Sequence, residues 1–272
     1  MSADRPTREA PLGVPPAGES ARKFTSPTAA APVVVGVDGS DGAHDAEEMA
    51  RLLSSIRGTS CIVAGDLISS GRMLIERAES EGAGTIVVGS PHRGKLGRAL
   101  LGSVAEHILD RAPCEVVVAP RGYAAGGHTG LAKIAVAVDG TPESKVALTR
   151  AEDLARQAGA TIEVLVASDP VVADVEAEYP PDAPASMSDV LEAALGSVDP
   201  ALAPTGKKVD SGRRQVVRAI AAALAAACDP DVDLLVAGSR SPIEHMLFGS
   251  VTKQLINESP CPVLVVPDTK RA

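Results

Sequence analysis

The sequence predicts an α/β protein built from two tandem domains, each a parallel sheet of the flavodoxin-like or Rossmann-like kind. Apolar runs of strand length alternate with stretches of helical periodicity, which is typical of parallel sheets with right-handed crossovers. Two of these runs end in the same motif, Val-Asp-Gly followed by Ser or Thr, at 37–40 and 138–141. A length of 272 residues also agrees with two domains.

A second repeated motif supports the duplication. Near the end of each copy, Gly-Ser-Val opens a helix-like stretch and a Pro-Cys pair precedes the last apolar run. Gly102 and Cys114 are separated by as many residues as Gly249 and Cys261. An internal repeat indicates one supersecondary unit used twice. We therefore expect one domain at 32–121 and a second at 131–268.

The segments outside these domains have a different composition. Residues 1–31 are rich in Pro, Ala, Ser and Thr without periodicity, so they cannot bury enough apolar surface and we predict a disordered tail. Residues 122–130 include Gly126-Gly127, and we predict a flexible linker there.

The first domain shows four strand-like runs. Residues 33–37 are continuously apolar, as in a sheet covered on both faces. The helix that follows carries Ala46, Met49 and Leu53 at helical spacing. The remaining expected elements are a strand at 61–64, a helix near 73–78, strands at 86–88 and 116–118, and a helix at 103–111.

The second domain shows five strand-like runs, one of them weak. An acidic, Pro-rich loop is expected at 168–185. The expected strands lie at 134–138, 162–166, 207–209, 234–237 and 263–266, and the expected helices at 142–158, 188–195, 213–227 and after Ser250.

Composition excludes several classes of protein. A net charge of −9 repels a polyphosphate backbone, so nucleic acid is not expected as a partner. No apolar window is long enough to span a bilayer and no signal peptide is visible, so we expect a cytoplasmic protein without a membrane partner. The four cysteines lie beside apolar runs without CxxC spacing, which indicates reduced, buried thiols. The five histidines have no metal-ligand spacing, so no metal site is expected.

A glycine-rich segment at 89–103 connects the strand at 86–88 to the helix at 103–111. Glycines let the backbone approach a phosphate, and the first amides of a helix point at the anion. Arg93, Lys95 and Arg98 add positive charge to the same loop. The alternative is a glycine-rich turn in which Ser103 caps the helix, with Glu106 completing a capping box.

Ligands of such sheets bind beyond the carboxyl ends of the strands. Asp38 and Gly89 both follow strands of the first copy, and Asp139 and Gly238 follow strands of the second. We therefore expect each pair to face one crevice.

Together these motifs resemble the universal stress protein family, here as a tandem of two domains over about 33–120 and 131–267. The resemblance implies a five-stranded parallel sheet of the adenine-nucleotide α-hydrolase type, and pairing of domains through their last strands. It therefore implies an internal pseudo-dimer through 116–118 and 263–266, with a homodimer of whole chains as a further alternative. Many members of the family bind ATP through a glycine loop, and others bind none and act by contact.

Transferred to the first copy, the family motif implies a candidate nucleotide site, with ATP and Mg²⁺ as the ligand. His92 stands where the motif has its middle glycine, and Gly94 follows it. The separation of Asp38 from Gly89 is shorter than that of Asp139 from Gly238 by about one βα unit, so the second or the third strand is missing. In the family the second strand helps to form the base pocket. The residues implied are Asp38, Gly89, Arg93, Gly94, Gly102 and Ser103.

The second copy departs from the motif differently. Its sheet is complete, but the loop between Gly238 and Gly249 is two residues shorter, lacks glycine and carries Glu244. An acidic side chain in a tight loop opposes a triphosphate. The corresponding positions, Asp139, Gly238, Gly249 and Ser250, are therefore interpreted as a degenerate site that does not bind ATP.

Three functions follow from these observations. The first is a non-catalytic stress-response regulator or interaction module with at most a partial adenine-nucleotide site, because each copy lacks part of the crevice. The second is an ATP-binding protein that uses the loop at 89–103. The third is a weak nucleotide hydrolase, for which Asp38 and Asp139 are the only acidic residues at strand ends. Neither carboxylate has an obvious partner, so no catalytic residue is assigned and no enzyme activity is expected.

Overall fold

The computed structural model describes residues 31–65, 70–90, 101–168, 186–210, 225, 230–239 and 250–267. The first copy contains β1 (Val33–Gly36), α1 (Asp41–Arg57), β2 (Cys61–Ala64), α2 (Gly71–Ser80), β3 (Thr85–Gly89), α3 (Ser103–Arg111), β4 (Glu115–Ala119) and the 3₁₀ turn η1 (Tyr123–Gly126). The second contains β5 (Lys133–Ala137), α4 (Pro142–Ala158), β6 (Thr161–Ser168), α5 (Met187–Ser197), η3 (Pro200–Leu202), β7 (Thr205–Asp210), β8 (Leu234–Gly238), α7 (Ser250–Glu258) and β9 (Val263–Val266).

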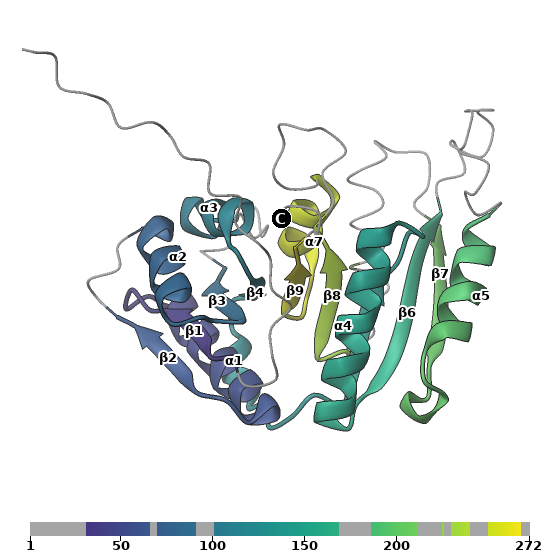
Figure 1. Cartoon of the computed structure of the whole chain (residues 1–272), viewed down its shortest axis with the longest axis horizontal. Helices are drawn as coiled ribbons and strands as arrows, with labels where there is room; N and C mark the ends of the chain where they lie inside the picture. The colour runs from purple at the N-terminus through teal and green to yellow at the C-terminus, as the bar shows by residue number, and fades with distance from the viewer. Residues whose placement is uncertain are drawn as a thin grey trace, which may run out of the picture.

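The two copies share one nine-stranded sheet, in the order β2-β1-β3-β4-β9-β8-β5-β6-β7 (Figure 1). Within each copy the strands are parallel. At the junction β4 and β9 are antiparallel, with Val116 opposite Val265 and Val118 opposite Val263. The predicted α/β class and the internal pairing of 116–118 with 263–266 are therefore confirmed.

The strand missing from the first copy is the counterpart of β7. β2 lies beside β1 as β6 lies beside β5, so the second strand is present in both copies. β7 and α5 then cover β6, and the described residues of the first copy contain no counterpart of either. The effect is visible at Val63, which is 49% exposed, whereas Val164 at the matching position is fully buried.

Alternate residues of the strands face two separate apolar cores, because successive side chains of a strand point to opposite faces. On one face α1, α4 and α5 pack over Val35, Val87 and Val136. On the other face α2, α3 and α7 pack over Ile86, Val116 and other strand residues. Helices on both faces explain the continuous apolar runs of the central strands.

The matching helices α1 and α4 begin and end with the same chemistry. Ser40 and Thr141 occupy the N-caps, and each side-chain oxygen accepts a hydrogen bond from a backbone amide of the first turn. Gly58 and Gly159 close the helices in the left-handed conformation, which glycine adopts without strain. The duplication therefore extends to the residues at which these two helices begin and end.

The linker starts as ordered structure packed against the first copy. The Asp45 side chain, 3% exposed on α1, accepts hydrogen bonds from the amides of Gly122 and Ala124, both at 2.8 Å. Tyr123 is buried and its ring stacks on that of His128, with centroids 4.2 Å apart. The glycine content predicted flexibility here, but it did not predict that a buried carboxylate would hold the start of the linker.

Among the helices of the described residues, none has both the length and the apolar character needed to cross a membrane.

Candidate functional site

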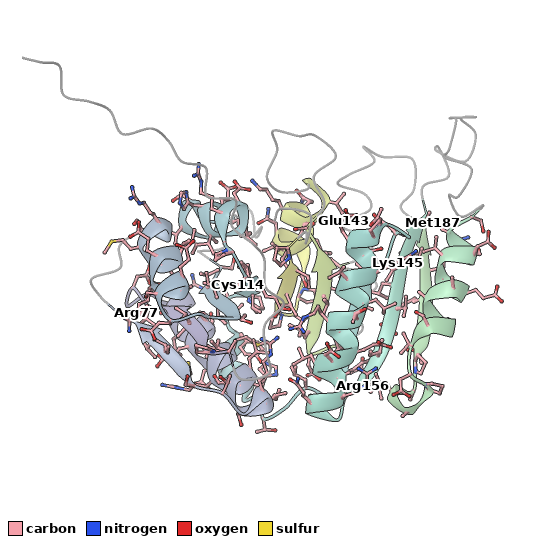
Figure 2. All side chains as sticks on the ribbon, in the orientation of Figure 1. Arg77, Cys114, Glu143, Lys145, Arg156 and Met187 are labelled. Atoms are coloured by element: carbon pink, nitrogen blue, oxygen red, sulfur yellow. The ribbon has the colours of Figure 1, made fainter. Side chains whose placement is uncertain are left out.

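The crevice expected in each copy is bounded by the first turn of a helix and the end of a strand. Glycine at position 89 allows a very close approach, because a Cβ there would lie 1.9 Å from the carbonyl oxygen of Gly42 in α1. In the second copy, a Cβ on Gly238 would lie 3.0 Å from the carbonyl oxygen of Glu143 in α4. Glu143 lies in the first turn of α4, at the N-terminal end of the helix and near the carboxyl end of β8 (Figure 2). The same packing thus occurs in both copies, and it explains each glycine without a ligand.

The two strand-end aspartates have matching roles in turns. An Asp38 carboxylate oxygen accepts from the Ser40 amide at 3.1 Å, and an Asp139 oxygen accepts from the Thr141 amide at the same distance. Hydrogen bonds from the side chain and backbone of Ser40 hold the pKa of Asp38 below its usual value. The registers of β1 with β3 bring Asp38 to the same sheet edge as Gly89, as expected. Each aspartate therefore organises the entry into its helix.

The start of α3 lacks the expected capping box. Gly102 is the N-cap residue and Ser103 is the first helical residue, and within the described residues no side chain caps this helix. The first helical hydrogen bond runs from the Glu106 amide to the Gly102 carbonyl oxygen, at 2.9 Å. The capping-box prediction for Ser103 and Glu106 is wrong, because Ser103 already has helical geometry and cannot cap from inside the helix. The first amides of α3 are consequently available to an acceptor from outside the helix.

Part of the predicted site lies outside the described residues. This applies to Arg93, Gly94 and Gly249, together with the other loop residues at 91–100 and 240–249. Ser250 is the first residue of α7. The described part of the first site thus consists of the turn at Asp38, the end of β3 at Gly89 and the start of α3 at Gly102 and Ser103.

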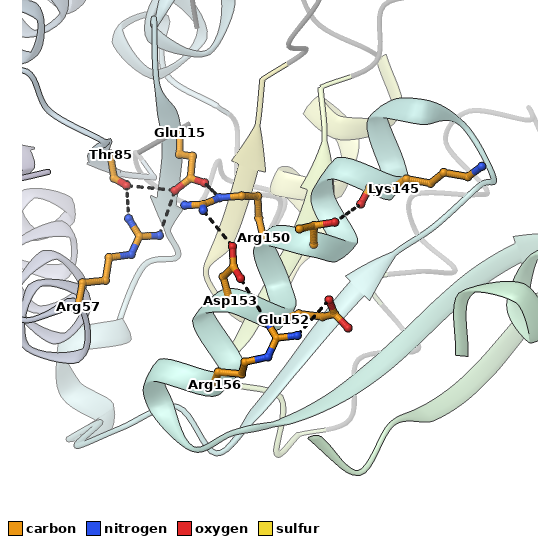
Figure 3. A network of polar contacts seen from close by, with 9 residues as sticks. Arg57, Thr85, Glu115, Lys145, Arg150, Glu152, Asp153 and Arg156 are labelled. Carbon is orange, nitrogen blue, oxygen red and sulfur yellow. Dashed lines mark hydrogen bonds and ion pairs between the residues drawn. The ribbon is translucent and has the colours of Figure 1, made fainter. Parts of the chain in front are cut away.

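A buried ionic network that the sequence analysis did not predict connects the copies (Figure 3). Glu115, fully buried at the start of β4, accepts from Arg57 of α1 at 3.0 Å and from Arg150 of α4 at 2.6 Å. Arg57 also donates to the Thr85 hydroxyl at 2.6 Å, and Arg150 lies 3.4 Å from Asp153. The two copies of the Pro-Cys motif differ at the next residue, which is Glu115 in the first copy and Pro262 in the second. This difference is the only sign of the network in the motif. Glu115 lies at the amino end of β4, whereas the candidate site lies at the carboxyl ends of the strands, so we interpret this buried ion pair as structural.

The Cys61 and Cys114 thiols are not suited to nucleophilic catalysis. Cys61, Cys114 and Cys261 form no disulfide; Cys114 and Cys261 are buried as predicted, whereas Cys61 is only partly buried. Burial raises the pKa of the Cys114 thiol to about 12, and burial also raises the pKa of Cys61. A thiol that stays protonated at neutral pH is a poor nucleophile. Among the described residues there is no cluster of three or more His, Cys, Asp or Glu side chains able to hold a metal ion.

Comparison with known proteins assigns this architecture to a family. The sequence model of the universal stress protein family matches residues 50–120 and 131–267, once for each copy and over most of the chain. The chain belongs to the universal stress protein family. The second matched range contains β5 to β9, and the first contains β2, β3 and β4, while β1 precedes it.

Individual universal stress proteins agree with this assignment. A universal stress protein of Mycolicibacterium smegmatis is 31% identical over 202 residues, which is 73% of this chain and 66% of that protein. Universal stress protein Rv2005c of Mycobacterium tuberculosis is 31% identical over 199 residues, 68% of this chain and 62% of that protein. The chain therefore spans slightly less than two thirds of the length of these relatives. The fold is also similar to that of a universal stress protein crystal structure from Archaeoglobus fulgidus, with a TM-score of 0.58 and 16% identity over 86% of this chain and 98% of that one.

Proposed function

We propose that this universal stress protein is a non-catalytic, cytoplasmic regulator of the stress response that binds an adenine nucleotide, as ATP with Mg²⁺, in its first copy. The second copy binds none, and the protein acts by contact with a partner. The observation that carries this proposal is the start of α3, where Gly102 leaves the first-turn amides without a side-chain cap.

The phosphate end of the ligand fits this position. The uncapped amides of α3 lie at the carboxyl edge of the sheet, after the glycine-rich loop, and both the free N–H groups and the helix dipole favour an anion there. Gly102 and Ser103 are the described residues that would hold the phosphate. The Mg²⁺ ion would enter with the nucleotide and neutralise part of its charge.

The base end of the ligand is supported by the strand order. The resemblance assigns part of the base pocket to the second strand, and the first copy keeps that strand as β2 beside β1. The unit it lacks is one strand farther from the crevice. This removes the main sequence-based objection to a nucleotide in the first copy.

The absence of catalysis is supported by the roles of the two aspartates. Asp38 and Asp139 are engaged by the amides of Ser40 and Thr141, and the lowered pKa of Asp38 makes it a weak base at neutral pH. We therefore expect phosphate release from ATP to be no faster with the protein than without it.

Replacing Gly102 with aspartate is expected to abolish nucleotide binding while preserving the fold. Gly102 has φ −74°, which every residue adopts, and aspartate at an N-cap is more favourable than glycine by roughly a few tenths of a kcal/mol. The new carboxylate would take the amides that the phosphate needs and repel it. Isothermal titration with ATP and Mg²⁺ should show at least a hundredfold loss of affinity, with an unchanged or higher melting temperature.

The matched control is Gly249→Asp, at the corresponding position of the second copy, which should leave the affinity unchanged. Wild-type protein that gives no heat with ATP would refute nucleotide binding and leave the contact-only regulator. That alternative is favoured by one observation, since packing against Gly42 already explains the glycine at position 89.

A further inference from the structure

A side chain of the second copy holds the backbone at the candidate site of the first. The Asn257 side-chain oxygen, on α7, accepts a hydrogen bond from the Leu101 amide at 2.9 Å. Leu101 immediately precedes Gly102, the N-cap of α3. Both residues are partly buried, so water competes weakly for this bond. The contact joins residues of different copies at the point where the loop enters the helix.

The antiparallel pairing of β4 with β9 explains why this contact exists. It brings α3 and α7, the helices that precede these strands, close together on one face of the sheet (Figure 1). A second contact in the same place joins Lys253 of α7 to Asp110 of α3, with 3.6 Å between nitrogen and oxygen. The junction therefore aligns the start of α3 with a fixed side chain of the other copy.

Counted from the repeated glycines Gly102 and Gly249, Asn257 and Asp110 occupy equivalent positions. Both offer a side-chain oxygen as an acceptor, but they differ in charge. Asn257 satisfies the Leu101 amide without placing a negative charge beside the start of α3. An uncharged acceptor is compatible with a bound phosphate, whereas a carboxylate in the same place would repel it.

We propose that Asn257 is a positioning residue for the nucleotide site of the first copy, so that this site is completed by the second copy. The inference rests on the proposed function, because it concerns the same phosphate site. It gives the second copy a role that does not require a nucleotide of its own: α7 fixes the backbone from which the first-turn amides of α3 project.

The test compares Asn257→Ala with the wild-type chain by two independent measurements. The first is the exchange rate of the Leu101 amide by NMR without ligand, which should rise at least tenfold when its acceptor is removed. The second is the affinity for ATP with Mg²⁺ by calorimetry, which should fall about tenfold, as for the loss of one hydrogen bond that orders a site. The matched control is Gln254→Ala on the same helix, because Gln254 bonds only to Glu258 in the described contacts and should change neither quantity.

A second variant separates positioning from charge. Asn257→Asp keeps the shape and the acceptor, so the Leu101 amide should stay protected, but the added charge should lower the ATP affinity at least as much as Asn257→Ala does. Retained protection with lowered affinity supports the proposal. A purely structural role predicts wild-type affinity for this variant.

The remaining outcomes are decisive. Unchanged Leu101 exchange in Asn257→Ala overturns the inference, and so does faster exchange with wild-type affinity. If the wild-type chain binds no ATP, the proposed function fails and the nucleotide part of the inference fails with it. The exchange measurement still decides in that case whether Asn257 holds the start of α3, so the two failures are distinguishable.

Discussion

Replacing Gly89 with alanine is expected to destabilise the protein by about 3 kcal/mol or more. The new Cβ would lie 1.9 Å from the carbonyl oxygen of Gly42 and 2.4 Å from its carbonyl carbon. Both are backbone atoms of the first turn of α1, so no side-chain rotation can relieve the overlap. The whole start of α1 would have to move away from β3, against the packing of Met49 and Leu53, which are fully buried. Urea unfolding followed by circular dichroism measures the loss.

Gly238→Ala is the matched control in the second copy. Its Cβ would lie 3.0 Å from the Glu143 carbonyl oxygen, a tight contact that a shift of a few tenths of an ångström relieves. We expect a loss of about 1 kcal/mol or less. Equal effects of the two substitutions would contradict the explanation, because the local packing and not the motif sets the cost. The comparison also bears on function: the glycine at position 89 is required by packing whether or not a phosphate binds.

The features that could be predicted from the sequence are those that repeat or follow from local pattern. Continuous apolar runs located the central strands, and the repeated Val-Asp-Gly-Ser/Thr motif located the helix entries at Ser40 and Thr141. The pairing of β4 with β9 followed from the family resemblance. Of the candidate site, the position of Asp38 and Gly89 at the same edge of the sheet could be predicted, since parallel strands bring their carboxyl ends to one edge.

The features that could not be predicted depend on contacts between distant residues. The sequence left open whether the second or third strand is missing, because the length of an omitted βα unit does not say where it belonged. Asn257 has no local signal either: a single asparagine in an amphipathic helix gives no indication that its partner is the Leu101 amide in the other copy. The capping box failed for a local reason: the predicted helix at 103–111 has the observed bounds, so Ser103 is its first residue and Gly102 is its N-cap.

Replacing Glu115 with glutamine is expected to lower the free energy of unfolding by about 3–5 kcal/mol. Glu115 is fully buried, and its two oxygens accept separately from Arg57 of the first copy and Arg150 of the second. Glutamine fits the same space but removes the carboxylate that Arg57 and Arg150 share, and leaves Arg150 with only the longer contact to the more exposed Asp153. The two arginine side chains are only 8% and 15% exposed, so water cannot replace the carboxylate. Urea unfolding provides the measurement.

An exposed ion pair provides the control for the loss of stability expected at the buried Glu115. Arg72 and Glu76 of α2 are 81% and 56% exposed, and Glu76→Gln should leave the urea midpoint almost unchanged. The contrast between the two substitutions tests whether burial, and not the presence of an ion pair, determines the cost. A Glu115→Gln protein that unfolds at the wild-type urea concentration would contradict the assignment of Glu115 as the buried counter-ion.

Removing all three charges together should have a different result from removing one. In a combined Arg57→Met, Glu115→Leu and Arg150→Met variant no unpaired charge remains, and apolar groups fill a junction that already borders Val87 and Val117 in the core. Such replacements are often neutral or stabilising, so we expect the triple variant to be more stable than Glu115→Gln alone. The single substitution lowers the stability because it leaves buried arginine charges without the Glu115 carboxylate, and the triple variant removes those charges as well. The same three residues join α1, β4 and α4, so the alignment of the two copies should become less specific even where stability returns. Faster exchange of the Leu101 amide in the triple variant would reveal that loss at the proposed nucleotide site.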